Sequence, residues 1–141
     1  MQQPIRVLFV CDGNAGRAQL AAGLLRSRGG ARFAVHSAAI EPRPQEPLAV
    51  AVMQEIGIDI GEPAGKSLND YEDLQFDYVV TLYEDEQPTC LDFSRDGHAL
   101  YWRCPDPSEV TGAEAERLAA FRQARDALKA QVEAWCAALP G

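Results

Sequence analysis

Cysteine and arginine stand six positions apart near the start of the chain, at Cys11 and Arg17. Between them lie Gly13, Asn14 and Gly16, which tolerate the positive φ angles of a tight loop. In such a loop the backbone N–H groups converge on one point and form a cradle for an anion. A cysteine at this cradle is expected to have a lowered pKa, and an arginine can bind two oxygens of a tetrahedral oxyanion. These residue types therefore indicate nucleophilic attack by Cys11 on the central atom of phosphate or arsenate.

The spacing alone is weak evidence, because roughly 0.3 such pairs are expected by chance in a chain of this composition. A buried cysteine at a strand end beside a surface arginine is the alternative interpretation. The context favours the functional one. Residues 5–10 form an apolar, β-branched run typical of a buried strand, and residues 17–28 predict a helix stopped by Gly29 and Gly30. The loop thus joins a strand to a helix whose positive end adds to the cradle.

The rest of the chain continues this alternation of strands and helices. Further strands are predicted at 33–37, 78–82 and 98–102, and helices at 48–56, at 70–74 as a short turn, and from Thr111 or Gly112 onward. The pattern predicts an α/β fold: an open, mainly parallel, twisted four-stranded sheet with helices on both faces and an N-terminal C-x5-R loop. Ligands of such sheets bind beyond the carboxyl ends of strands, where residues 11–16 fall.

Length and charge narrow the functional classes. The 141 residues fit a single domain, 1–141, and the net charge of −8 disfavours a nucleic-acid or membrane-surface binder. Residues 1–43 are nevertheless basic, with six arginines against two acidic residues. We see no membrane-spanning run, no signal peptide and no CxxC pair among the four cysteines. We therefore expect a cytoplasmic protein with reduced cysteines, no metal site and no cofactor.

The segment from Val7 to Ala21 resembles the phosphate-binding loop of the low-molecular-weight tyrosine phosphatase superfamily. It is most similar to the arsenate reductase branch, where the loop commonly ends Asn-Ala-Gly-Arg-Ser-Gln. The resemblance continues in family order over nearly the whole chain, at 36–38, 57–60, 77–82, 102 with 105–107, 121–122 and 125–126. It implies the phosphatase-like fold and a catalytic cysteine.

The resemblance also implies roles for individual residues. Cys11 would be the nucleophile, Arg17 the oxyanion clamp, and Asp106 the general acid that protonates the leaving oxygen. The oxyanion-binding loop would comprise Asp12, Gly13, Asn14, Ala15, Gly16, Arg17 and Ala18. The alternative for Asp106 is an ordinary turn residue, because aspartate beside proline is common in turns.

Departures from the family bear on activity. Ala18 replaces a serine whose hydroxyl normally donates to the thiolate, which predicts a less acidic Cys11. Tyr83 and Cys90 stand where thioredoxin-coupled arsenate reductases have two further cysteines, so the relay through both is broken. Ser108 follows the Asp-Pro where phosphatases have tyrosines that hold an aryl substrate, which disfavours phosphotyrosine.

Several assignments stay open at this stage. Cys90 could resolve a Cys11 adduct or be an ordinary loop cysteine, and Cys104 is a second, less favoured candidate. An external thiol from thioredoxin, glutaredoxin or a small molecule could do the same. His36 is expected to be structural and Cys136 to lie in the core. The acidic cluster at 84–86 is either a solvated loop or a contact for a reducing partner.

The sequence therefore favours an arsenate reductase-like enzyme acting on a small oxyanion through Cys11, Arg17 and Asp106, with a second thiol resolving the adduct. One alternative is a low-molecular-weight phosphatase, in which water resolves a phospho-cysteine. Another is a non-catalytic oxyanion-binding module. Some arsenate reductases bind potassium near the loop, but the acidic position of the first helix is Ala22 here, so we predict no cation.

Overall fold

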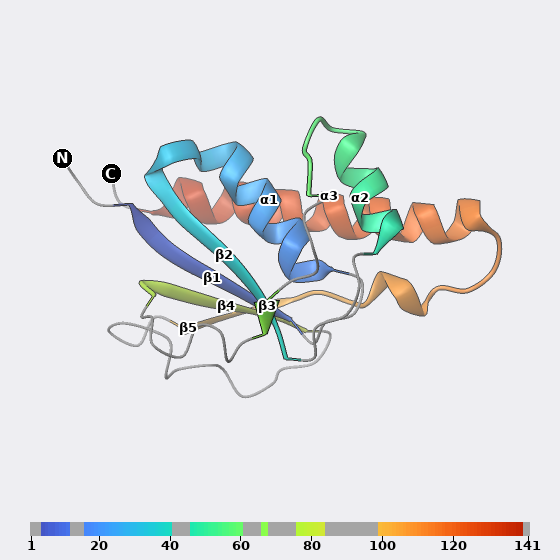
Figure 1. Cartoon of the computed structure of the whole chain (residues 1–141), viewed down its shortest axis with the longest axis horizontal. Helices are drawn as coiled ribbons and strands as arrows, with labels where there is room; N and C mark the ends of the chain where they lie inside the picture. Colours follow the sequence, from blue (N-terminus) through green and yellow to red (C-terminus); the bar gives the residue numbers. More distant parts are fainter. Residues whose placement is uncertain are drawn as a thin grey trace.

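The computed structural model describes residues 4–11, 16–40, 46–60, 66–67, 76–83 and 99–139. The strands among them are β1 (Ile5–Cys11), β2 (Phe33–Ala39), β3 (Lys66–Ser67), β4 (Tyr78–Tyr83) and β5 (Ala99–Arg103). They form one parallel sheet in the order β3-β2-β1-β4-β5, with β1 at its centre (Figure 1). The four predicted strands are confirmed. The two-residue β3 extends one edge and was not predicted.

The helices are α1 (Arg17–Gly29), α2 (Pro47–Gln54) and α3 (Glu114–Ala138), with short 3-10 helices η1 (Gly30–Arg32) and η5 (Pro107–Glu109). In Figure 1, α1, α2 and α3 lie on the same side of the sheet. The turn predicted at 70–74 falls outside the described residues, so a helix on the other face stays a prediction. No helix in the described part of the chain is long and apolar enough to cross a membrane.

Glycines set the ends of two helices. Gly30, with a φ of 54°, follows α1 and confirms the predicted stop. The last helix begins at Glu114 and not at Thr111 or Gly112, so that part of the prediction was wrong. The reason is local: Gly112 has a φ of 115° and Ala113 is extended, and neither conformation continues into a helix.

β1 is buried on both faces, as its unbroken apolar sequence predicts. Val7, Phe9 and Cys11 belong to the main core cluster on the helix side. Leu8 and Val10 point the other way and belong to a second, smaller cluster. All five side chains are at most 2% exposed. The alternation along the strand therefore places Cys11 under the helices, at the carboxyl end of the central strand.

A cluster of charged side chains joins the end of α2 to α3. Arg125 of α3 is 9% exposed, and its Nη1 donates to the Val52 carbonyl at 2.9 Å and to Glu55 Oε1 at 2.8 Å. Arg122, one turn earlier on α3, binds the same carboxylate through Nη2 at 2.7 Å and Nε at 3.0 Å. The Val52 carbonyl lies in the last turn of α2, where intrahelical donors run out. Arg125 thus caps α2 and fixes it to α3.

Candidate active site

Cys11 and Arg17 lie at the junction that the sequence predicted. Cys11 ends β1 and is 2% exposed, and its carbonyl accepts a hydrogen bond from the Ile40 N–H at 3.0 Å. Arg17 opens α1 and is also 2% exposed. Gly16 between them has a φ of 65°, a value that favours glycine and confirms the expected loop conformation at this position.

Gly16, Arg17 and Ala18 are the residues of the predicted oxyanion-binding loop that the structure describes. Asp12, Gly13, Asn14 and Ala15, predicted to bind the oxyanion, lie outside the described residues. Ala18 is buried in the main core cluster at 2% exposure, and it brings no hydroxyl to the site. The thiolate therefore has no donor from this side chain, as the sequence predicts.

Burial of Arg17 is the main surprise, because guanidinium groups are rarely fully buried without partners. Its Nη1 donates to the Cys104 carbonyl at 2.6 Å, across 87 positions of sequence. This charge-assisted bond ties the start of α1 to the segment that leaves β5. The Cys104 carbonyl is a site group that the sequence did not reveal, because a main-chain acceptor has no side-chain signature.

Asp106 lies two residues further along that segment and is partly buried. It caps η5: its Oδ1 accepts hydrogen bonds from the Ser108 N–H at 2.8 Å and the Ser108 hydroxyl at 2.6 Å. Pro107 occupies the first position of η5. The turn interpretation of Asp106 is thus correct in geometry, and the acid role that the resemblance implies stays a prediction.

The pKa of the Cys104 thiol depends on the charges of all three predicted site residues. It is 4% exposed, and burial is the largest cause that raises its pKa, to about 11. The positive charge of Arg17 lowers this pKa, whereas the negative charges of Cys11 and Asp106 raise it further. Cys11, Arg17 and Asp106 therefore all lie within electrostatic range of Cys104.

Other predicted residues have varied outcomes. Cys90 and the acidic cluster 84–86 lie outside the described residues. Cys136 is 6% exposed and belongs to the core, as predicted. His36 pairs with Leu8, and its ring contacts Phe76 edge-on at 5.5 Å between centroids, which supports a structural role. In the described part of the chain, no three His, Cys, Asp or Glu side chains form a metal-binding group.

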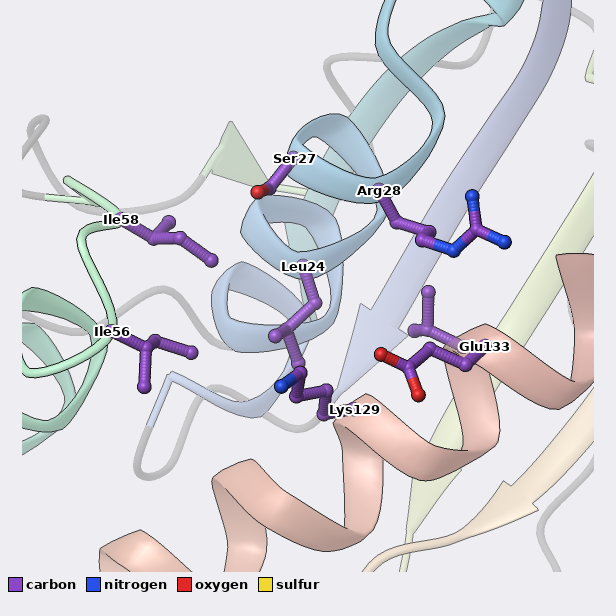
Figure 2. A pocket seen from close by; sticks show the side chains of 8 residues that line it. Leu24, Ser27, Arg28, Ile56, Ile58, Lys129 and Glu133 are labelled. Atoms are coloured by element: carbon purple, nitrogen blue, oxygen red, sulfur yellow. The ribbon is translucent and has the colours of Figure 1, made fainter.

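A separate hollow of about 280 Å³ lies between α1, α3 and the residues after α2 (Figure 2). Leu24 and Val132 are its buried apolar residues, whereas Arg28, Lys129 and Glu133 are exposed. These positions belong to the later turns of α1 and α3. None of the predicted site residues lines this hollow, so it is distinct from the site at the start of α1.

A buried cysteine at the carboxyl end of a central parallel strand, followed by a helix that opens with a buried arginine, is typical of α/β proteins that use a cysteine on a small oxyanion. The chain can be assigned to one family within this general class. Residues 6–140 match the low molecular weight phosphotyrosine protein phosphatase family, and the chain belongs to that family.

Several relatives of this chain are arsenate reductases. An arsenate reductase of Halalkalibacterium halodurans is 35% identical over 128 residues, which cover 90% of this chain and 91% of that protein. A solved arsenate reductase in the phosphate binding state superposes with a TM-score of 0.79 at 26% identity, covering 96% of this chain and 99% of that one. Another, in the reduced state, has a TM-score of 0.77 at 28% identity, covering 94% and 97%. The predicted fold and family are thus confirmed.

Proposed function

We propose that this chain is a thiol-dependent arsenate reductase. The observation that carries the proposal is the burial of both Cys11, at the end of β1, and Arg17, at the start of α1. The chain also has arsenate reductase relatives over nine-tenths of its length. A relative solved in a phosphate binding state supports a tetrahedral oxyanion as ligand. The chain acts as one domain, 1–141, in the cytoplasm, where cysteines stay reduced.

In the first step the Cys11 thiolate attacks arsenic(V), and the sulfur–arsenic bond forms as one oxygen leaves. Arg17 binds oxygens of the arsenate and stabilises the charge that develops on them. Asp106 gives its proton to the departing oxygen, which leaves as water. The two bonds from Ser108 hold the Asp106 carboxyl group in one orientation during this transfer.

In the second step another thiolate attacks the Cys11 sulfur. The disulfide bond forms, the sulfur–arsenic bond breaks, and its electron pair goes to arsenic, which leaves as arsenite. The second thiol is Cys90 or an external thiol of thioredoxin, glutaredoxin or a small molecule. The two electrons that reduce arsenic come from Cys11 and this second thiol. An external thiol then reduces the resulting disulfide, because Tyr83 stands where the resemblance places the resolving cysteine of the relay.

Cys104 is a poor candidate for this second thiol. β4 separates β1 from β5, so the Cα atoms of Cys11 and Cys104 lie roughly 10 Å apart at a strand spacing of about 4.8 Å. A disulfide needs Cα atoms within about 7 Å. The pKa of Cys104, raised to about 11 by burial, also keeps it a thiol at neutral pH.

Phosphate monoester hydrolysis is the second candidate function, and membership of the phosphatase family favours it. Both reactions share the Cys11 adduct and differ in whether water or a thiol resolves it. Ser108 and Glu109 form part of η5 where aryl-binding tyrosines would be expected from the resemblance, which favours the reductase.

One set of assays tests the proposal. Arsenate-dependent thiol oxidation is measured with thioredoxin, glutaredoxin and small thiols separately, beside turnover of an aryl phosphate. Cys11→Ser should abolish arsenate reduction, whereas Cys136→Ser, at a buried cysteine of α3, should retain it. Reduction that survives Cys90→Ser identifies an external resolving thiol. If Cys11→Ser changes neither rate, both enzymatic functions are wrong.

A further inference from the structure

The Arg17 guanidinium must be oriented before it can present two donors to an oxyanion. Its five N–H groups are rigidly arranged in one plane, so fixing one of them restricts the directions of all the others. The bond from Nη1 to the Cys104 carbonyl, at 2.6 Å, is such a constraint. A carbonyl also adds no negative charge, so this bond holds the guanidinium without neutralising it.

The Cys104 carbonyl is itself held by its side chain. Trp102 and Cys104 both belong to the main core cluster, at 7% and 4% exposure, and the Trp102 ring packs on Phe9 of β1 at 5.7 Å between centroids. The thiol therefore anchors the chain where it leaves β5. Pro105 follows directly, fixes its own φ and restricts the backbone of Cys104, so the orientation of the carbonyl is coupled to the position of the thiol.

The same short segment leads to the general acid. Asp106 is two residues beyond the carbonyl, caps η5, and η5 packs on α3. The segment 104–106 is thus attached at one end to Arg17 and at the other to α3. A shift of Cys104 would move the acceptor of Arg17 and the start of the Asp106 turn together.

We propose that Cys104 is a positioning residue for the oxyanion site, which orients Arg17 through its main-chain carbonyl and requires a small buried side chain to do so. The inference rests on the proposed binding of an oxyanion by Arg17. It assigns to Cys104 a role that needs no sulfur chemistry. A larger side chain at this position forces the backbone to shift, because a closely packed core cannot absorb added methylene groups.

A double-mutant cycle with inorganic phosphate as the probe tests this role without relying on turnover. Cys104→Leu should weaken phosphate binding about tenfold, and Cys104→Ala, which keeps the residue small, should stay within about threefold of the parent. In an Arg17→Lys background, Cys104→Leu should change phosphate affinity less than about twofold, because its effect passes through the guanidinium. Calorimetry of the folded, reduced proteins measures all five affinities.

Cys136→Leu is the matched control, since Cys136 is a buried cysteine of the same core cluster on α3. It should lower stability and leave phosphate affinity unchanged. Should Cys104→Leu fail to fold, Cys104→Val enters the same cycle with a smaller increase in volume. Equal losses from the Cys104 variant in both backgrounds would overturn the inference. If Arg17→Lys alone leaves phosphate affinity unchanged, the clamp in the proposed function fails instead.

Discussion

Arg125 and Arg122 bind the same carboxylate of Glu55, and burial should decide which of them stabilises the fold. Arg122 makes three hydrogen bonds to Glu55, but its side chain is 45% exposed. Arg125 makes only one to Glu55, its side chain is 11% exposed, and it also donates to the Val52 carbonyl. Exposed ion pairs contribute about 0–1 kcal/mol. A buried carbonyl that loses a charged donor costs about 2–3 kcal/mol.

Arg125→Met keeps most of the aliphatic stem and removes the donors, so it should lower the unfolding free energy by about 2–3 kcal/mol. At about 3 °C per kcal/mol for a chain of this size, Tm should fall by about 6–9 °C. Arg122→Met should lower Tm by about 3 °C or less. Thermal and urea unfolding followed by circular dichroism measure both. Equal losses in the two variants would refute the reasoning that the buried carbonyl, and not the number of bonds to Glu55, sets the cost.

Three further predictions concern other parts of the molecule. Gly23→Ala should destabilise by about 1–3 kcal/mol in urea despite better helix propensity, because the new Cβ would lie 2.8 Å from Ile60 Cγ2 and 3.2 Å from Met53 Cε; a gain in stability would contradict this. The hydrogen bond from Arg122 is the largest cause that lowers the pKa of Glu55, to about 2. The contribution of the Glu55 carboxylate to stability is therefore present above about pH 4.5 and lost as pH falls through about 2. Glu55→Gln should remove this decrease of the unfolding free energy in acid. Burial raises the pKa of Cys104 from 9.0 to about 11. The contribution of the buried thiol to stability is therefore complete below about pH 9 and lost as pH rises through about 11. In alkaline unfolding titrations the loss should reach about 2–3 kcal/mol, and it should be absent in Cys104→Ala.

The strands and the place of Cys11 at the end of the central strand were predictable because their signals are local. The apolar run at 5–10 indicates a buried strand without any information from distant residues. Gly16 likewise indicates a tight loop before α1 by its residue type alone, and its φ of 65° agrees. The ends of α1 followed from Gly29 and Gly30 for the same reason. These are properties of residues and their immediate neighbours.

Tertiary contacts were not predictable in the same way. The spacing of Phe121, Leu128 and Val132 is typical of one buried helix face, and all three are buried, but this spacing gives no sign that Arg125 joins them. A charged residue at a core position becomes favourable only when an acceptor such as the Val52 carbonyl comes from another helix. The two-residue β3 is likewise too short for its composition to carry a signal, and its pairing with β2 defines it.

The charge of the chain and the charge of its proposed ligand are reconciled by where one arginine lies. A net charge of −8 repels anions at long range, but salt screens exposed charges beyond about 8 Å. Arg17, at 2% exposure, acts at short range in a poorly screened setting, where an ionic interaction is stronger than in water. Its bond to the Cys104 carbonyl fixes the guanidinium without adding a negative charge. A carboxylate in place of that carbonyl would place a negative charge beside Arg17, so we expect it to weaken the proposed binding of an oxyanion.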